Sequence, residues 1–595
     1  MATITEALLA AVDHHQAGRL NEAATLYARI LEADPEQPDA AQLLGVLYAQ
    51  AGHAAKGVGL LRRSLASRPD SAGGQSNLGG ALHSLGDAAG AEDAFRRALR
   101  LDPGLADAHA SRAGALRALG RAGEGAASAA RALALDPIHA EALANRADSL
   151  LALRRAPAAE MAARRALAVR PAFPEAQMAL GSALAAQHRW DGAEVAYRAA
   201  LACRPRLAEA WENLGALLAK LGRFDESLAA FAEAEALRPG PSLWAARGTA
   251  LVAMARPAEA LADIDRALAA RPQDAGLHWN RGFARLLAGD YAGGWPEFDW
   301  RRHDQGAEPP WRTFPQPTWS GPGAGEDIAG RTILLYAEQG LGDTLQFMRY
   351  VPLVAARGAR VILEVQPPLL SVLEGMEGAD RVIARGDPLP PFDLECPLMS
   401  LPRALGTTLD RVPAVVPYLR PDPVRAAAWK ERLREGEGLR VGPRVGLVWA
   451  GNPRFPGDRL RSPRLEGLRP VLDVPGVRFF GLQKGPGRED LEGAPLPAAF
   501  TDLGPEIADF ADTAAIMANL DLVISSCTGP AHLAGALGVP LWVVLPFSPD
   551  WRWLLDRQDS PWYPTARLFR QDRVGDWRTV AGRVAEALRG FTPSA

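Results

Sequence analysis

Residues 77–103 read NLGGALHSLGDAAGAEDAFRRALRLDP, and this pattern recurs through the first half of the chain. Its small and apolar positions form two groups at helical spacing: Leu78, Gly79 and Leu82, then Ala91, Phe95 and Ala98. Asp102-Pro103 ends the second helix, because proline has no amide hydrogen and disfavours helical geometry at the residue before it. The stretch therefore predicts a pair of helices.

The pattern has a fixed period. Prolines recur with six gaps of 34 residues and a last gap of 33, at Pro35, Pro69, Pro103, Pro137, Pro171, Pro205, Pro239 and Pro272. A small residue lies nine or ten positions after each: Gly45, Gly79, Ala113, Ala147, Gly181, Gly215, Gly248 and Gly282. This period is typical of tetratricopeptide (TPR) repeats, which form an α-solenoid. Eight repeats fit from about residue 4 to 274, and we expect a ninth, ending GDYAGGWPEFDWRR at 302, to cap the stack.

Asparagine recurs two positions before the small residue, at Asn77, Asn145, Asn213 and Asn280. This face of the first helix usually lines the concave groove of a TPR solenoid. An amide both donates and accepts, so it can bind a peptide backbone without reading its side chains. The hypothesis is a groove for an acceptor peptide. The alternative is that each amide bonds within its own repeat.

Composition narrows the class of protein. A chain of 595 residues exceeds one core, so at least two domains are expected. The net charge of −3 favours neither nucleic acid nor an anionic membrane as a partner. Three scattered cysteines indicate a reducing compartment. No secretory signal is recognisable and no apolar run is long enough for a membrane span, so we expect a cytoplasmic protein.

The first half ends in a linker. Residues 308–327 contain five prolines and three glycines without apolar periodicity, and Trp311 and Trp319 suggest that this segment packs against one neighbour. We predict a TPR solenoid over 1–305, a Pro/Gly-rich linker over 306–330, and two further lobes over 331–430 and 431–595.

Short β-runs alternate with helices in the second half. The predicted strands are RTILLYAEQ (331–339), ARVILEVQ (359–366), DRVIARG (380–386), RVGLVWAG (444–451), VRFFGLQ (477–483), LVISS (522–526) and PLWVVLP (540–546). Such alternation predicts parallel sheets of the doubly wound, Rossmann-like kind. Ligands of these folds bind at the carboxyl ends of the strands, so a cleft between the two lobes is the expected site.

The first candidate site is the turn Gly340-Leu341-Gly342-Asp343-Thr344, which follows a strand and opens a helix. Its glycines allow a backbone to approach a ligand closely, and a helix N-terminus favours negative charge. Asp343 is either a helix cap or a general base that faces the cleft.

Two further candidates lie after strands of the second lobe. Thr528 and Gly529 begin a helix whose free amides form a phosphate cradle, unless the turn is merely structural. The polar and basic residues Asn452, Arg461, Gln483 and Lys484 lie at other strand ends and suit a diphosphate, although a solvated basic surface is the alternative.

These motifs carry a resemblance. GLGDTLQFMRYVP (340–352) and TGPAHLAGALGVP (528–540) resemble the two motifs of heptosyltransferase-related GT-B glycosyltransferases. The chain as a whole resembles bacterial TPR–glycosyltransferase fusions, with flagellin-modifying and O-linked N-acetylglucosamine transferases as relatives. The resemblance implies that Asp343 is the catalytic base and that Thr528, Gly529, His532 and Lys484 bind the donor phosphates. It also implies a nucleotide-sugar donor and no bound metal.

The resulting hypothesis is a protein glycosyltransferase that modifies Ser or Thr of an acceptor protein, with flagellin as a candidate. The alternatives are a transferase for glycan or lipid-linked acceptors and a non-catalytic TPR scaffold with a decayed second half. One departure favours the scaffold: Cys527 replaces the aspartate that usually precedes the threonine. Cys527 is expected to be a packing residue rather than a nucleophile. Self-association of the TPR surface stays open.

Overall fold

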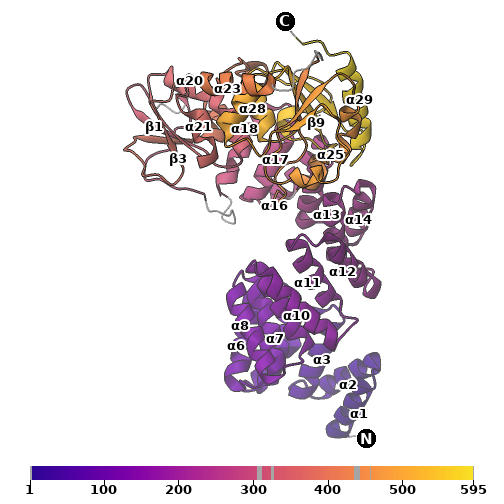
Figure 1. Cartoon of the computed structure of the whole chain (residues 1–595). Helices are drawn as coiled ribbons and strands as arrows, with labels where there is room; N and C mark the ends of the chain where they lie inside the picture. The colour runs from indigo at the N-terminus through magenta and orange to yellow at the C-terminus, as the bar shows by residue number, and fades with distance from the viewer. Residues whose placement is uncertain (1–2, 304–310, 323–326, 435–441, 456, 594–595) are drawn as a thin grey trace. The chain divides into compact units, whose positions relative to one another are not determined.

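The computed structural model describes residues 3–303, 311–322, 327–434, 442–455 and 457–593. It divides into two compact units (Figure 1). One comprises residues 1–217 with 232–238, and the other comprises 218–231 with 239–595. The second unit therefore contains helices from the end of the repeat region together with both sheets.

The repeat region begins with successive helix pairs, which confirms the TPR prediction. Their bounds are α1 Ile4–Gln16, α2 Leu20–Ala33, α3 Pro38–Gln50, α4 Ala54–Ser67, α5 Ala72–Ser84, α6 Ala88–Leu101, α7 Ala106–Ala118, α8 Ala122–Leu135, α9 Ala140–Ala152, α10 Ala156–Val169, α11 Pro174–Ala186, α12 Trp190–Cys203, α13 Ala208–Lys220 and α14 Phe224–Leu237. The small residue is required by packing, because a Cβ at Gly79 would lie 2.7 Å from Cε1 of Phe95. Phe95 of the second helix thus packs directly on the backbone of the first, and Tyr197 packs on Gly181 in the same way.

Four more repeat helices belong to the second unit: α15 Pro241–Ala253, α16 Pro257–Ala270, α17 Ala275–Leu287 and α18 Tyr291–Phe298. The ninth repeat, which we expected to cap the stack, packs against the sheet region. The Trp295 indole donates to the carbonyl of Thr407 at 2.9 Å, and the Trp562 indole donates to the Tyr291 hydroxyl at 2.9 Å. All three aromatic residues of α18, Tyr291, Trp295 and Phe298, are buried in the core of the sheet region. The last repeat is therefore part of that core.

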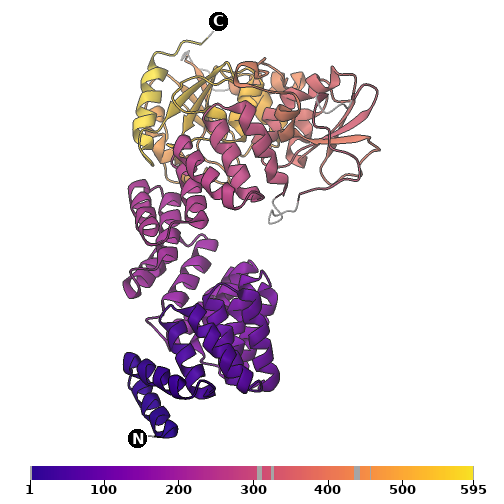
Figure 2. The same ribbon diagram turned by 180° about the vertical axis from the view of Figure 1, so that it is seen from behind.

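Two parallel sheets form the rest of the second unit (Figures 1 and 2). Their strands are β1 Thr332–Tyr336, β2 Arg360–Val365, β3 Arg381–Ala384, β4 Leu394–Pro397, β5 Arg444–Val448, β6 Arg478–Gly481, β7 Phe500–Asp502, β8 Leu522–Ser526, β9 Leu541–Leu545 and β10 Ala566–Arg570. The first sheet has the order β3-β2-β1-β4 and the second has β10-β9-β8-β5-β6-β7. The predicted parallel sheets are confirmed.

Helices connect these strands: α19 Leu341–Phe347, α20 Val351–Ala355, α21 Leu370–Leu373, α22 Leu401–Ala404, α23 Pro423–Arg434, α24 Asp458–Arg461, α25 Arg464–Gly467, α26 Arg469–Leu472, α27 Phe510–Met517, α28 Gly529–Ala536 and α29 Trp577–Arg589. Three strands escaped prediction, namely β4, β7 and β10. β4 ends in a proline, β7 has three residues and β10 contains two arginines, so none has a continuous apolar run.

The predicted linker is partly described, since residues 306–310 and 323–326 lie outside the described ranges. Its central part is ordered against the first sheet. Thr318 forms a parallel bridge with Glu395 of β4, and the amide of Trp319 donates to the Glu395 carbonyl at 2.8 Å. Trp319 is buried in the same core as α18. The predicted boundary at 430 falls within the single helix α23, and the domain limits stay a prediction.

Candidate functional site

A cavity of about 840 Å³ lies where the carboxyl ends of strands from both sheets meet. Its walls follow β1 in the first sheet and β5, β6, β8 and β9 in the second. It is lined by ten of the eleven cleft residues that the sequence singled out: Gly340, Gly342, Asp343, Asn452, Arg461, Gln483, Lys484, Thr528, Gly529 and His532. The remaining one, Thr344, is buried away from this lining, and its hydroxyl donates to Gln366 at 2.8 Å.

Asp343 is the third residue of α19, and both of its carboxylate oxygens are engaged. One accepts a hydrogen bond from the backbone N–H of Gly340 at 2.8 Å. The other accepts from the guanidinium of Arg552. Asp343 therefore caps the start of its own helix and also forms an ion pair with the opposite wall of the cavity. The geometry is compatible with both hypotheses for this residue, the helix cap and the general base.

Arg552 is the main cleft residue that the sequence did not reveal. It lies in a single helical turn, η8 Trp551–Trp553, that follows β9. Its buried guanidinium also donates to Gln346 and to Asp550, the latter at 2.9 Å. The sequence signal for Arg552 is a charged residue between two tryptophans. Its partner on the other wall, Asp343, is too far away in sequence for a local pattern to reveal the pair.

The start of α28 faces the cavity. Thr528 takes the extended N-cap conformation, and its hydroxyl donates to the carbonyl of Ser526 at 3.3 Å instead of accepting from the first helical amides. Gly538 at the other end has a φ of +71°, in the left-handed region typical of a residue just past a helix C-terminus. Because Pro530 has no N–H, the first amides of α28 are those of Gly529 and Ala531, and the Ala531 amide also donates to the Thr528 carbonyl at 3.0 Å.

His532 lies beneath this turn. Its Nδ1 contacts the Tyr563 hydroxyl at 2.9 Å, and its ring stacks on Trp553. Burial, followed by the nearby arginines, lowers the pKa of His532 well below its usual value, so the ring is neutral at pH 7. A Cβ at Gly342 would lie 2.7 Å from Cδ2 of His532, which explains a glycine there. His532 supports the wall as a neutral group rather than as a cation.

Two cations reach the cavity from the second sheet. The Arg461 guanidinium donates to Asp458 at 3.1 Å and lies 4.2 Å from the ring centre of Phe455. The Lys484 ammonium donates to the carbonyl of Ala508 at 2.9 Å and also to that of Ile507. Each of these two cations therefore lines the cavity, and part of its hydrogen-bonding capacity is satisfied by the protein.

Gln483 is held by backbone groups only. Its side-chain oxygen accepts from the amides of Trp449 and Ala450 at 3.1 and 3.0 Å, and its NH₂ donates to the carbonyls of Ala450 and Pro486. These four bonds use the full capacity of an amide side chain. Gln483 therefore shapes the cavity wall and is not placed to bind a ligand by hydrogen bonds. The Asn452 oxygen likewise accepts from the Arg454 amide at 3.0 Å.

Cys527 is half-buried beside the cavity and accepts a hydrogen bond from the Trp553 indole at 2.9 Å. Burial, followed by the charge of Asp550, raises the pKa of this thiol to about 11. A neutral thiol is a poor nucleophile, so this geometry favours packing over covalent chemistry.

The asparagines of the repeats contact neighbouring repeats in two cases. The Asn145 NH₂ donates to the carbonyl of Ala110 at 2.9 Å, and the Asn280 NH₂ donates to the Thr249 hydroxyl at 2.9 Å. In both, the partner belongs to the first helix of the preceding repeat rather than to the same repeat. A peptide groove formed with Asn77 and Asn213 stays a prediction.

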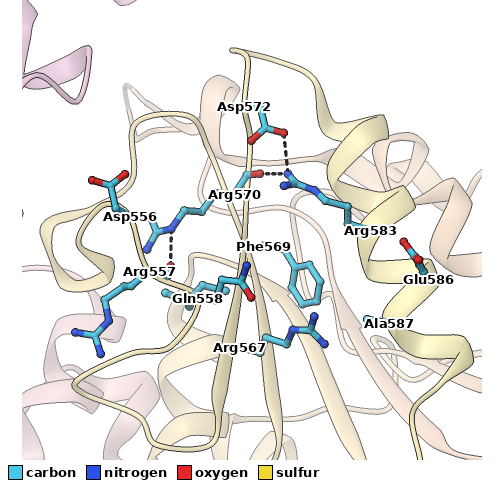
Figure 3. Close-up of a pocket in the computed structure, with 11 residues that line it drawn as sticks. Asp556, Arg557, Gln558, Arg567, Phe569, Arg570, Asp572, Arg583, Glu586 and Ala587 are labelled. Carbon is cyan, nitrogen blue, oxygen red and sulfur yellow. Dashed lines mark hydrogen bonds and ion pairs between the residues drawn. The ribbon is translucent and has the colours of Figure 1, made fainter.

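Another cavity, of about 660 Å³, lies beside the edge strand β10 (Figure 3). Its arginines are engaged by the protein: Arg570 donates to the carbonyl of Arg557 at 2.9 Å, and Arg583 pairs with Asp572 at 3.4 Å. None of the residues predicted for a site lines it. In the described ranges, no helix is both long and apolar enough to cross a bilayer, and no three His, Cys, Asp or Glu side chains are grouped to hold a metal.

Comparison with known proteins supports the repeats. Models of the tetratricopeptide repeat match residues 14–76, 74–105, 145–208, 178–241 and 245–294. The N-terminal half therefore consists of TPR repeats. Protein FlbA of Caulobacter vibrioides is 33% identical over 367 residues, which cover 56% of this chain and 59% of that protein. The aligned region thus spans less than two thirds of this relative.

Solved structures show partial similarity. The APC/C hetero-tetramer Cut9-Hcn1 is 18% identical with a TM-score of 0.39, over 44% of this chain and 52% of that chain. A tetratricopeptide repeat protein from Parabacteroides merdae is 17% identical with a TM-score of 0.34, over 42% of this chain and 98% of that one.

Proposed function

We propose that this chain is a protein glycosyltransferase of the GT-B type. It takes a sugar from a nucleotide-activated donor and transfers it to a Ser or Thr hydroxyl of an acceptor protein that the TPR repeats recruit. The observation that carries the proposal is the cavity between the two sheets. It gathers a glycine-rich turn, the starts of α19, α27 and α28, three carboxylates and three cationic side chains in one place.

The chemistry follows from this arrangement. Asp343 takes the proton of the acceptor hydroxyl as its oxygen attacks the anomeric carbon. The bond from that carbon to the donor phosphate breaks, and the nucleoside diphosphate leaves with the electron pair. Lys484, Arg461 and the first amides of α28 stabilise the negative charge that develops on the phosphate. Arg552 fixes the direction in which the Asp343 carboxylate points.

One observation favours a second candidate, the non-catalytic scaffold. Both oxygens of Asp343 and the ammonium of Lys484 already have protein partners. With these contacts the charged groups of the cavity are satisfied without any substrate, as expected of a non-catalytic protein. The third candidate, a transferase for glycan or lipid-linked acceptors, shares the same cleft chemistry and differs only in the acceptor.

The test is a transfer assay on the full chain with UDP-, GDP-, ADP- and CMP-sugars, using flagellin and a short sugar acceptor in parallel. We expect sugar on the protein acceptor, and we expect Asp343→Asn to lower the rate at least 100-fold. The matched control is Asp576→Asn, which removes a charge at the N-cap of α29 and keeps a capping oxygen. Transfer to the sugar acceptor alone would favour the third candidate, and no transfer with any donor would favour the scaffold.

A further inference from the structure

The first sheet carries three buried carboxylates. Glu338 follows β1, Glu364 lies in β2 and Glu395 lies in β4, and their side chains are 2, 2 and 3% exposed. Burying an ionised carboxylate without a partner is costly, so each of these groups needs a cation close by.

The cations come from outside the sheet. Arg301 and Arg302 lie in η1 Asp299–His303, the helical turn that ends the last repeat, and Arg312 lies in the segment predicted as linker. Arg301 pairs with Glu338 at 2.7 Å and Arg302 with Glu395 at 2.9 Å, while Arg312 pairs with Glu364. The end of the repeats therefore neutralises the acidic sheet.

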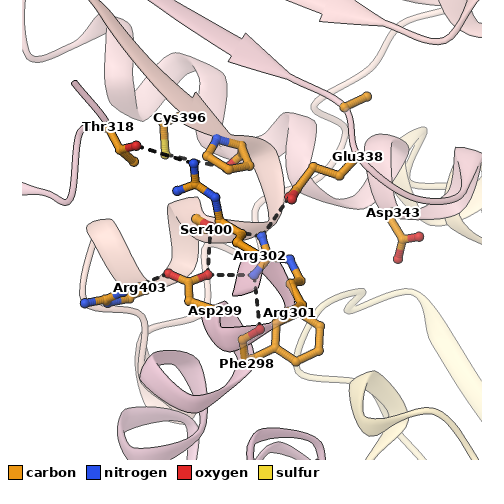
Figure 4. A network of polar contacts seen from close by, with 12 residues as sticks. Phe298, Asp299, Arg301, Arg302, Thr318, Glu338, Asp343, Cys396, Ser400 and Arg403 are labelled. Carbon is orange, nitrogen blue, oxygen red and sulfur yellow. Dashed lines mark hydrogen bonds and ion pairs between the residues drawn. The ribbon is translucent and has the colours of Figure 1, made fainter. Parts of the chain in front are cut away.

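Arg301 is the most enclosed of the three, with its side chain 2% exposed (Figure 4). Its guanidinium donates to Asp299 at 2.6 Å and to the Ser400 hydroxyl at 2.9 Å, in addition to Glu338. Asp299 is held in turn by Ser400 at 2.7 Å and by Arg403 at 3.0 Å. Three contacts, one within η1, one after β1 and one after β4, thus fix the direction in which Arg301 points.

Glu338 leads directly into the cleft. It stands two residues before Gly340 and five before Asp343, and residues 339–343 line the cavity. A second contact holds the turn of residues 339–343: the NH₂ of Gln366 donates to the Gln339 carbonyl at 2.9 Å. The turn is therefore held by Gln366 on one side and by Glu338 on the other.

We propose that Arg301 is a positioning residue: through Glu338 it holds the 339–343 turn in place on the wall of the cleft. Arg301 does not itself line the cavity. The last TPR repeat is then a structural part of the cleft, and a partner that shifts this repeat shifts the turn. The relevance to transfer rests on the proposed function, whereas the positioning itself does not.

Hydrogen–deuterium exchange of the full chain, read by mass spectrometry, tests this without any ligand. The variant Arg301→Met with Glu338→Met removes both charges together, so no unpaired ion is left buried. We expect peptides that cover 337–345 to exchange at least fivefold faster, with unchanged exchange in β5, β8 and β9. Glu338→Gln keeps an acceptor for Arg301 and should retain most of the protection.

The matched control is Arg403→Gln, which removes another arginine from the same network but has a half-exposed side chain and no contact with Glu338. It should leave 337–345 unchanged. Unchanged exchange at 337–345 in the double variant would overturn the proposal, as would an equal rise over the whole second unit. Neither result depends on sugar transfer, so failure of this inference and failure of the proposed function are distinguishable.

Discussion

Arg552 in the turn after β9 donates to the Asp343 carboxylate at the start of α19, so an ion pair joins the two walls of the cleft. Asp343 belongs to the half built on the first sheet, and Arg552 belongs to the half built on the second. Any substrate that reaches Asp343 does so beside this guanidinium. The pair therefore limits which faces of the carboxylate remain accessible.

The first prediction concerns this pair. Arg552→Gln should lower the stability of the second unit by about 3–5 kcal/mol, since it leaves the Asp343 carboxylate without its cation. Asp343→Asn should cost less, because Arg552 keeps its ion pair with Asp550 at 2.9 Å. The double variant should lose less than the sum, by about 1–3 kcal/mol. Chemical denaturation of the four proteins measures this coupling.

The control for that cycle is the surface pair Arg557 and Asp559, in which the aspartate side chain is 70% exposed. Its coupling should be below about 1 kcal/mol. Additive losses at Asp343 and Arg552 would mean that the two residues do not interact in solution.

The second prediction compares the folding of two truncated fragments of the chain. A fragment of residues 326–595 lacks α18 and Arg301, so it exposes the surface that Tyr291 and Trp295 cover and leaves Glu338 buried without a cation. We expect it to aggregate or to lack a cooperative melt. A fragment of residues 205–595 retains these groups and should melt cooperatively. Equal melting temperatures for the two fragments would contradict the role given to the last repeat.

The third prediction is a pH dependence in the first unit. Burial raises the pKa of Asp148 from 3.8 to about 6. The folded form thus keeps a proton that the unfolded chain has released, and stability falls as the pH rises from about 4 to about 6. Asp148→Asn mimics the protonated form, so it should stabilise the first unit by about 1–3 kcal/mol at pH 8 and by little at pH 4.

Thermal melts of the full chain at both pH values measure this gain. Asp191→Asn is the control, because Asp191 is exposed in the first turn of α12 and should show no such difference. A gain that is equal at pH 4 and pH 8 would show that Asp148 does not titrate as described.

The repeats could be predicted from the sequence because their information is local. A 34-residue period and a small residue that faces a large apolar one, such as Gly79 against Phe95 or Gly248 against Ile264, predict the helix pairs without distant contacts. The cleft turns were also predictable, since Gly340 and Thr528 each follow an apolar strand. Parallel strands then bring their carboxyl ends together.

Long-range contacts could not be predicted in this way. Tyr291 meets Trp562 across 271 positions, and Asp343 meets Arg552 across 209. No local pattern marks such partners, so the docking of α18 and the importance of Arg552 appeared only in the structure. For Thr344 and Gln483 a role in ligand binding stays a prediction, and the structure adds that their side chains form hydrogen bonds within the protein.

The proposed nucleotide site in the cleft is tested most directly by a thermal-shift panel of UDP, GDP, ADP, CDP and CMP on the full chain. A nucleotide at 100 times its dissociation constant stabilises the unit that binds it by about 2.7 kcal/mol. We predict a shift with one nucleotide class, reduced at least tenfold in affinity by Lys484→Ala. No shift with any nucleotide would contradict the claim and leave the chain as a TPR scaffold.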